Sequence, residues 1–425
     1  MIQIEKLSSL QPVCLVATGR SGSDYFQSLL DGHPEVLTFN LHFRFLTEYL
    51  PTANTWRNSE TILGDFIDEF IGKNLERLVT IYQEHENLDK LGKERNQSLR
   101  IDTFIFKKYF LELLTGSHID QRLVLLAIYG AYNLSLGRKL SDMKVFFHHA
   151  HNIHEAKKFK EVFPNAKLIT TIRDPRSAIV SANKIACNPK NREWDNYRNF
   201  YISLCNTIFE DPSANSFFLK VLRQDIAFGP VQNKILIKSL DKDALLVRLE
   251  DIPKKEFLCA LADYLGIKYL PSLELSTWGG LEWWGDSLSS KKLSPSGWME
   301  NKTYNGWRKE LSRKDLYIIN NVLNDILLKR GYEVNQITNL SLFNSMFLLL
   351  LPLRLELRYL DPITILKTVI KGNMRQKIHA ISFPIFFIKV RIMLFLFLHA
   401  QITGVWKEWP GTILGKKETP SNGIR

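Results

Sequence analysis

The amino-acid sequence predicts an α/β protein with a parallel central sheet and a helical C-terminal extension. Short apolar runs over 12–18, 143–147, 166–172 and 244–249 are typical of buried strands. Helical periodicity separates these runs, and strands that alternate with helices favour a parallel sheet with right-handed crossovers. The apolar residues make up 45% of the chain, which is enough for a large core and excludes global disorder.

The predicted helices follow the strands in order along the chain. One helix begins near Asp24, and a long helical pattern covers 60–137. A basic amphipathic helix is expected over 153–163, another helix opens at Pro175, and a further one lies around 254–265. Each predicted strand is therefore followed by helical chain.

The domain organisation is interpreted as one domain over 1–335, with 60–137 as a helical insertion, and a basic, apolar helical extension over 336–425. From Val334 onward there are twelve Lys/Arg and four Asp/Glu, and this difference of 12 − 4 = +8 is two-thirds of the net charge of +12. A basic segment of this kind points towards an anionic surface.

Two stretches of the extension are strongly apolar, but neither is a clean membrane span. Pro352 interrupts the end of 334–353, while Lys389 and Arg391 lie near the middle of 379–406. Charges that recur beside apolar side chains favour a helix in the membrane interface, and hence peripheral membrane contact. The alternative is a helical cap packed on the main domain.

The cysteines and the N-terminal residues indicate the cellular compartment of the protein. The four cysteines (Cys14, Cys187, Cys205 and Cys259) are far apart, which suits buried thiols in a reducing compartment. The N-terminus lacks a basic start followed by an apolar region, so no signal peptide is expected. We expect a cytoplasmic protein at the inner face of the membrane, with no nucleic-acid partner and no metal.

The sequence GRSGS over 19–23 follows the first predicted strand and precedes a helix. Such a turn binds anions, because unpaired backbone N–H groups converge there and the helix dipole favours negative charge. Gly22 allows close approach of a phosphate, Ser21 and Ser23 add hydroxyl donors, and Arg20 adds a permanent cation. The Walker pattern is absent, because no Lys-Ser/Thr pair follows the second glycine.

The longer segment GRSGSDYFQSLLDGHPEV, over 19–36, resembles the 5′-phosphosulfate loop of sulfotransferases that use 3′-phosphoadenosine-5′-phosphosulfate (PAPS). The resemblance implies a P-loop-NTPase-like three-layer fold and PAPS as the co-substrate. It assigns the donor's 5′-phosphosulfate to Arg20 and the backbone of Ser21, Gly22, Ser23 and Asp24. Many members carry Thr at the position of Asp24, so this carboxylate should point away, cap the helix or pair with a basic neighbour.

A second motif, RDPR over 173–176, ends the third predicted strand and is followed by Ser181. Ligands of open α/β sheets bind at the carboxyl ends of strands. In sulfotransferases this arrangement is the 3′-phosphate site, so the resemblance implies Arg173 and Ser181 as ligands and a structural role for Arg176. The alternative is a capped helix with a surface pair between Asp174 and Arg176.

Two shorter matches to the same family follow in chain order. The segment VRLED, over 247–251, resembles a strand end of many sulfotransferases. The segment NGWRK, over 305–309, resembles the segment that closes over the nucleotide, and implies that Trp307 or Arg308 contacts the donor base or phosphate.

Sulfuryl transfer requires in-line geometry, stabilisation of charge on the leaving oxygen, and a general base for the acceptor hydroxyl. Arg20 is the candidate cation. The segment over 146–152 places three histidines near a strand end, and we favour His149 as the base, with His148 and His151 as alternates or leaving-oxygen contacts. His42 is the second candidate. The remaining candidate is Glu48, and the alternative interpretation of the three histidines is that they cap the helix at Ile153.

The tryptophans suggest an acceptor. Trp278, Trp283, Trp284 and Trp298 form a cluster in the sequence that suits the stacking of sugar rings, although packed tryptophans would look the same. With the basic apolar extension, they favour a glycan or lipid-linked glycan. Two other function classes remain open: a nucleotide kinase, which would need the missing Lys-Ser/Thr pair and a Mg²⁺-binding Asp, and a non-catalytic nucleotide-binding membrane scaffold.

Overall fold

The computed structural model describes the chain in segments that are separated by gaps. These are residues 2–17, 21–42, 44–49, 60–83, 86–150, 153–174, 176–178, 180–181, 244–286, 306–322, 327–328, 331–333, 351–354, 357, 360–374, 376–378, 380–381, 384 and 388. The chain forms two compact units. The first comprises Met1–Ile172, Leu240–Met299 and Gly411–Arg425, and the second comprises Arg173–Ser239 and Glu300–Pro410. The domain boundary near residue 335 stays a prediction.

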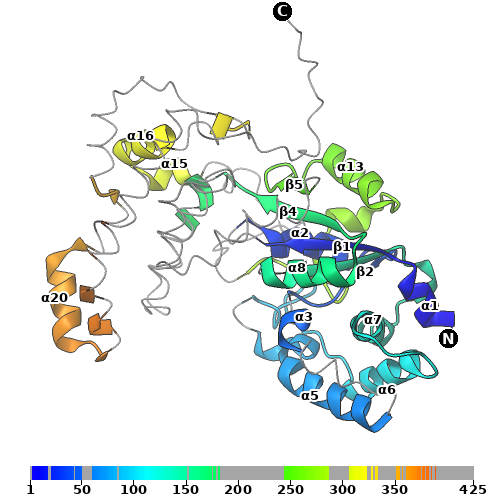
Figure 1. Cartoon of the computed structure of the whole chain (residues 1–425). Helices are drawn as coiled ribbons and strands as arrows, with labels where there is room; N and C mark the ends of the chain where they lie inside the picture. The colour runs from blue at the N-terminus through cyan, green and yellow to red at the C-terminus, as the bar shows by residue number, and fades with distance from the viewer. Residues whose placement is uncertain are drawn as a thin grey trace, which may run out of the picture. The chain divides into compact units, whose positions relative to one another are not determined.

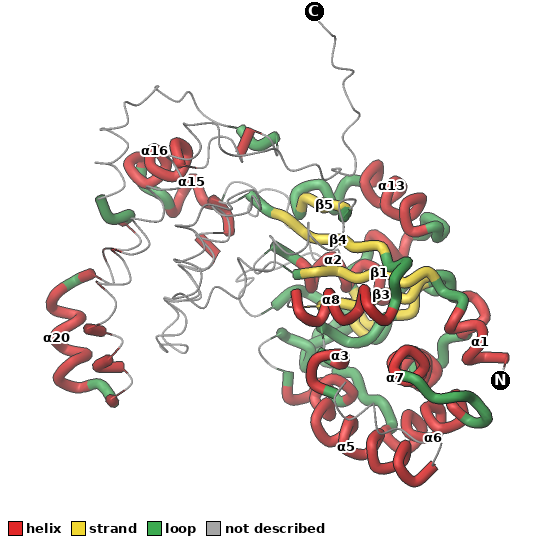
Figure 2. Tube along the Cα trace, in the orientation of Figure 1, coloured by secondary structure: helices red, strands yellow, loops and turns green. Residues whose placement is uncertain are grey.

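The first unit is built on a five-stranded parallel sheet. Its strands are β1 (Gln11–Val16), β2 (Val36–Leu37), β3 (Val145–Ala150), β4 (Lys167–Ile172) and β5 (Leu245–Arg248), in the order β2-β3-β1-β4-β5. Figure 2 shows these strands in yellow with helices around them. The predicted α/β fold with a parallel central sheet of the P-loop-like type is confirmed. Of these five strands, β2 was not predicted, because a strand of two residues has no measurable periodicity.

Helices precede, connect and follow the strands of the sheet (Figure 1). They are α1 (Ile2–Ser8), α2 (Ser23–Asp31), α3 (Phe45–Glu48), α5 (Glu60–Leu78), α6 (Thr103–Leu114), α7 (Gln121–Ser135), α8 (Ile153–Val162) and α13 (Lys255–Leu265). Short 3-10 turns cover Thr80–Tyr82, Leu140–Asp142 and Pro271–Glu274. The α5, α6 and α7 helices fall within the predicted insertion. Asp102 caps α6 and Asp120 caps α7, each by accepting backbone N–H groups of the first turn.

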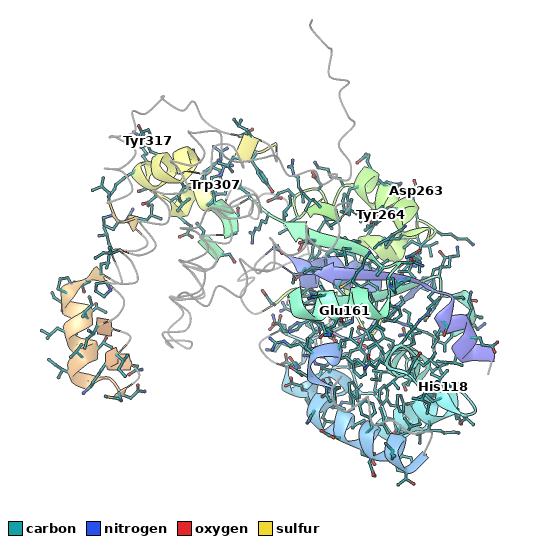
Figure 3. The ribbon with its side chains drawn as sticks, in the orientation of Figure 1. His118, Glu161, Asp263, Tyr264, Trp307 and Tyr317 are labelled. Atoms are coloured by element: carbon teal, nitrogen blue, oxygen red, sulfur yellow. The ribbon has the colours of Figure 1, made fainter. Side chains whose placement is uncertain are left out.

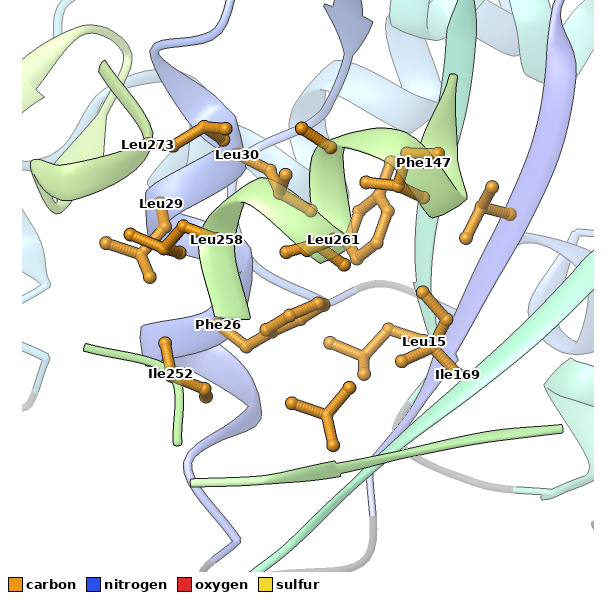
Figure 4. Packing of buried hydrophobic residues seen from close by; sticks show 14 of the residues in the cluster. Leu15, Phe26, Leu29, Leu30, Phe147, Ile169, Ile252, Leu258, Leu261 and Leu273 are labelled. Atoms are coloured by element: carbon orange, nitrogen blue, oxygen red, sulfur yellow. The ribbon is translucent and has the colours of Figure 1, made fainter. Parts of the chain in front are cut away.

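One face of the sheet packs against α2 and α13 (Figure 4). Alternate strand residues such as Leu15, Phe147 and Ile169 join Phe26 of α2 and Leu261 of α13 in a buried apolar cluster. Side chains of a strand point alternately to the two faces, so the neighbours of these residues face the opposite layer. Helices therefore cover both faces of the sheet, which explains why its strands are buried along most of their length.

The opposite face packs against α8 through aromatic rings. Phe146 of β3 lies 5.6 Å from Phe159 and 5.3 Å from Phe163, measured between ring centroids. Tyr129 of α7 meets Phe146 edge-on at 4.8 Å, and contacts of this geometry stabilise beyond the area they bury. Residues of β3 that differ by one position therefore face opposite helical layers, and His148 and His149 are such a pair.

The described helices of the second unit are α15 (Trp307–Glu310), α16 (Arg313–Val322) and α20 (Pro362–Lys371). A reciprocal cap starts α16: the Ser312 N–H donates to the Asp315 carboxylate, and the Asp315 N–H donates to the Ser312 hydroxyl, each at 3.1 Å. Arg354 N–H donates to the other Asp315 oxygen at 2.8 Å. Within the described segments, no helix is long and apolar enough to cross a membrane.

Candidate functional site

The carboxyl ends of β1, β3 and β4 meet at one edge of the sheet. Val16 is in register with Ala150 on one side and with Thr170 on the other. The Ala17 N–H extends the pairing by donating to the Ala150 carbonyl at 2.9 Å. The turn after β1 is therefore next to the ends of the strands that carry His149 and Thr171. Arg20 lies outside the described residues, so its assignment stays a prediction.

Gly22 ends this turn in a conformation that excludes a side chain. Its φ of 81° is left-handed, and its carbonyl accepts the Phe26 N–H at 2.9 Å to start α2. A Cβ at Gly22 would lie 2.4 Å from Cδ1 of Leu249. Gly22 has no side chain to cap α2, and the start of a helix favours an anion through its backbone N–H groups and its dipole.

Two serines flank Gly22, and both are buried. The Ser21 hydroxyl lies 2.7 Å from the Thr171 hydroxyl of β4, which ties the turn to the neighbouring strand. Ser23 is the first residue of α2. Sequence analysis missed Thr171 and Leu249 as supports of the turn, although Leu249 lies inside the VRLED match. Their contacts with the turn span more than 140 residues and leave no local signal.

His149 lies on the α2 face of β3 and is 1% exposed. Its Nδ1 lies 2.7 Å from Oε1 of Gln27 on α2. The Gln27 amide nitrogen donates to the Phe39 carbonyl at 2.7 Å, which sets Oε1 towards the histidine as an acceptor. His149 Nδ1 must then carry the proton, so in the neutral ring Nε2 is the basic nitrogen.

Gln27 is the contact of His149 that the sequence did not predict. It is 1% exposed on a helix whose buried neighbours Phe26, Leu29 and Leu30 are apolar. A buried amide among apolar residues needs partners, and that requirement was the available signal. Gln27 is a positioning residue, because it acts on the orientation and tautomer of His149.

Two more of the predicted site residues, His42 and Asp24, lie beside His149. The His42 ring meets the His149 ring nearly edge-on, with centroids 5.8 Å apart. Asp24 Oδ1 lies 3.8 Å from His149 Nδ1, which fits the expectation that this carboxylate pairs with a basic neighbour. The structure therefore brings His149, His42 and Asp24 together. Glu48 has an exposed ion pair with Arg44 at 3.9 Å.

His148 occupies the opposite face of the sheet, in the interior. Its ring stacks on Phe159 at 4.9 Å with an interplanar angle of 5°, and its Nδ1 lies 2.8 Å from the Tyr129 hydroxyl. Its Nε2 lies 3.5 Å from Glu155, whose carboxylate accepts the Leu46 N–H at 2.8 Å. This placement favours a structural role for His148. His151 lies outside the described residues.

The RDPR motif forms a buried network inside the second unit. Asp174 accepts from the Arg176 guanidinium at 2.7 and 2.9 Å, and both side chains are at most 6% exposed. Arg176 also donates to the Glu333 carbonyl at 2.9 Å, and its guanidinium carbon lies 4.1 Å from the centroid of the Trp307 ring. The predicted structural role of Arg176 fits this burial, whereas the alternative of an exposed Asp174–Arg176 pair does not.

The network joins the two predicted donor motifs of this unit. Trp307, labelled in Figure 3, is 4% exposed, and the Arg308 guanidinium carbon lies 4.7 Å from its ring centroid. Arg308 also pairs with the exposed Glu333 at 2.9 Å. Arg173 and Ser181 are both half-buried. Their roles, and those of Trp307 and Arg308 in donor binding, stay predictions.

The tryptophans of the sequence cluster are largely packed. Trp278 is fully buried in the hairpin of β6 (Thr277–Trp278) and β7 (Leu281–Glu282), and its ring meets Trp283 edge-on at 5.9 Å. Trp283 is 4% exposed and donates to the Glu86 carbonyl. Trp284 donates to the Gly92 carbonyl at 2.9 Å. Trp278 and Trp283 therefore serve the core, and Trp298 lies outside the described residues.

The sheet order and the glycine turn before α2 define the first unit as a P-loop-like α/β unit. The sulfotransferase family model matches residues 12–207. This region, which contains the turn, His149 and the RDPR motif, is therefore similar to the sulfotransferase family, as the motifs predicted. The match supports sulfuryl transfer as the class of reaction.

Two solved structures are similar to the chain. The sulfotransferase domain from the Synechococcus PCC 7002 olefin synthase is 16% identical, with 77% of this chain and 97% of that one covered and a TM-score of 0.38. The sulfotransferase domain from the curacin biosynthetic pathway is 15% identical, with 77% and 99% covered and a TM-score of 0.40. No curated protein matches the chain significantly. The family assignment rests on the match over 12–207.

Proposed function

We propose that the protein transfers a sulfuryl group from PAPS to an acceptor hydroxyl, with His149 as the general base. One observation carries the proposal. The same edge of the sheet holds the anion-binding turn at Gly22 and a buried histidine whose Nδ1–H is committed to Gln27. A phosphosulfate at the turn would place its sulfur near the basic Nε2 of His149.

The chemistry follows from these groups. His149 Nε2 accepts the proton of the acceptor hydroxyl as its oxygen attacks the sulfur of PAPS. A sulfur–oxygen bond forms, the bond from sulfur to the bridging phosphate oxygen breaks, and adenosine 3′,5′-bisphosphate leaves with the negative charge. The N–H groups that begin α2 and the proposed cation Arg20 stabilise that charge. By the resemblance, Arg173 and Ser181 bind the 3′-phosphate, and Trp307 or Arg308 contacts the donor.

The acceptor is proposed to be a hydroxyl of a glycan or lipid-linked glycan. Fewer tryptophans support a sugar acceptor than the sequence suggested, because Trp278 and Trp283 are buried. The basic apolar C-terminal segment still favours an acceptor presented near a membrane. Incubation of radiolabelled donor with membrane and soluble extracts, followed by identification of the labelled product, tests this part directly.

Thermal denaturation tests the donor. Adenosine 3′,5′-bisphosphate should raise the melting temperature of the purified chain, because a ligand that binds only the native state stabilises it. ATP should have little effect at the same concentration. Stabilisation by ATP alone would overturn the proposal and favour the nucleotide kinase.

A substitution separates catalysis from binding. His149→Asn should lower kcat by about 10²- to 10⁴-fold, the usual contribution of a general base, with stabilisation by adenosine 3′,5′-bisphosphate retained. His118→Asn, at an exposed histidine labelled in Figure 3, is the matched control and should leave kcat unchanged. If the chain binds the nucleotide but transfers no sulfuryl group to any extract, the non-catalytic scaffold would be favoured instead.

A further inference from the structure

The helix α20 of the second unit buries none of its residues. Ile363, Leu366 and Ile370 are 63%, 60% and 65% exposed. Their spacings of three and four residues put them on one side of the helix, in an uninterrupted apolar stripe. A stripe of this kind normally faces a core. Its exposure therefore indicates that a membrane or another molecule covers it.

The exposed apolar surface continues beyond α20. Met374, Ile378, Ile381 and Ile388 are 74%, 54%, 61% and 57% exposed, and each is assigned to helix. The spacings of four and three residues from Met374 to Ile381 again put side chains on one side of a helix, beyond the end of α20 at Gly372. We call these seven exposed residues of separate helical segments, from Ile363 to Ile388, the apolar face.

The charges beside this face have one sign. Between residues 362 and 391 the sequence has six Lys/Arg and no Asp/Glu. Lys367 and Lys371 each follow a residue of the stripe by one position, so they line one edge of it. The acid at the start of α20, Asp361, caps the helix by accepting the Ile363 and Thr364 N–H groups at 3.3 and 3.1 Å. Its charge is thus directed to the helix N-terminus.

We propose that the apolar face docks on an anionic lipid bilayer, with the helix axis in the plane of the interface. The apolar side chains would enter the boundary between headgroups and acyl chains, and the lysines at the edge would reach the lipid phosphates. The described helices are not able to span a membrane, which suits this in-plane arrangement. Docking of two copies through the same face is disfavoured, because it would bring basic edges of like charge together.

Vesicle flotation tests the proposal with the full chain. Binding is expected to vesicles of phosphatidylcholine containing about 30% phosphatidylglycerol, and much less to phosphatidylcholine alone, because basic residues near the surface respond to anionic lipid. Raising the salt concentration should weaken the bound fraction by screening. The double variant Leu366→Glu/Ile370→Glu should reduce the partition coefficient at least tenfold, and Lys367→Glu/Lys371→Glu should weaken its dependence on phosphatidylglycerol.

A matched control uses exposed apolar residues of the first unit. Phe104 and Ile105 are 85% and 44% exposed on α6, and Phe104→Glu/Ile105→Glu should bind vesicles like the unaltered chain. Because all these positions are exposed, each variant should keep its far-UV circular dichroism spectrum. Equal flotation of the Leu366→Glu/Ile370→Glu variant and the control would overturn the proposal.

A second outcome would also overturn it. If the unaltered chain does not float but is a dimer by light scattering, and Leu366→Glu/Ile370→Glu makes it a monomer, the apolar face is a protein interface. Stabilisation by adenosine 3′,5′-bisphosphate is measured on the same samples. Loss of vesicle binding is thereby distinguished from failure of the proposed sulfotransferase function.

Discussion

At the residue scale, the proposed chemistry depends on which nitrogen of His149 carries the proton. Gln27 settles that question through two contacts: its amide nitrogen donates to a backbone carbonyl, and its oxygen faces Nδ1. A histidine with a fixed Nδ1–H presents Nε2 as the base throughout the reaction. His148, one position earlier, instead contacts Tyr129 and Phe159 in the opposite layer.

Replacement of Gln27 tests this assignment. Gln27→Leu removes the acceptor, so His149 can adopt the other tautomer, and kcat should fall about tenfold or more with donor binding retained. Gln27→Glu should preserve the contact and move the acidic limb of the pH–rate profile to higher pH, because a carboxylate favours the protonated ring. Asn133→Leu, at a buried amide of α7, is the control for lost stability. Equal effects of Gln27→Leu and Asn133→Leu on kcat would contradict the positioning role.

A second histidine predicts the pH dependence of stability. His33 Nδ1 accepts the Glu35 N–H at 3.1 Å, so its Nε2–H donates to the Lys268 carbonyl at 2.8 Å. Burial lowers the pKa of His33 from its ordinary value of 6.5. Just below that value the unfolded chain binds the proton more readily than the folded chain, so the free energy of unfolding should fall as the pH drops.

Urea denaturation between about pH 7 and pH 5 measures this effect, because the ordinary pKa of histidine lies in that range. In His33→Asn the decrease should be shallower than in the unaltered chain. Exposed His118 provides the control, since His118→Asn should keep the full decrease. If His33→Asn and the unaltered chain lose stability in parallel, His33 does not contribute.

At the element scale, the anion-binding edge requires a helix that starts without a capping side chain. The left-handed φ of Gly22 lets α2 begin immediately after the turn, and Leu249, just after β5, fills the space where a Cβ would be. The Ser21–Thr171 contact holds the turn to β4. Three elements from distant parts of the chain therefore determine the position of one turn.

Substitution of Gly22 measures that constraint. Gly22→Ala should lower the free energy of unfolding by about 1–3 kcal/mol, as expected for a strained backbone position, and should also weaken binding of adenosine 3′,5′-bisphosphate. Gly116→Ala is the matched control, since Gly116 has a φ of 73° with no atom within 4 Å of the added Cβ. Gly22→Ala should be the more destabilising of the two because of the close approach to Leu249. Equal losses would show that this approach is relieved without cost.

At the scale of the whole molecule, the chain has two compact units with separate buried residues. Leu261 lies in the apolar cluster of the first unit, while Ile319 is 3% exposed in α16 of the second. Each unit has its own motif: the turn at Gly22 in the first and the Asp174–Arg176 network in the second. The GRSGS and RDPR motifs, which resemble one family, therefore lie in different units.

Calorimetry should therefore resolve two unfolding transitions. Leu261→Ala removes a fully buried side chain at a cost of about 2–5 kcal/mol and should shift one transition, while Ile319→Ala should shift the other. Ile62→Ala, at an exposed position of α5, is expected to shift neither. A single transition that moves with both buried substitutions would show that the units unfold together.

The sequence by itself determined the features that local patterns encode. The apolar runs of β1, β3, β4 and β5 identified the parallel sheet, because buried strands leave short continuous apolar segments. Gly22 and the two serines beside it predicted an anion-binding turn, and their motif predicted the match to the sulfotransferase family. These signals survive without tertiary information because each depends on residues close together in the chain.

Only the tertiary structure decided which polar residues act together. The choice of His149 over His148 depends on which face of β3 meets α2, and on Gln27, which is 122 residues away. The burial of Trp278 and the exposure of α20 depend likewise on what packs against each element. A residue type and its spacing determine what a side chain is able to do, but its neighbours are supplied by distant parts of the chain.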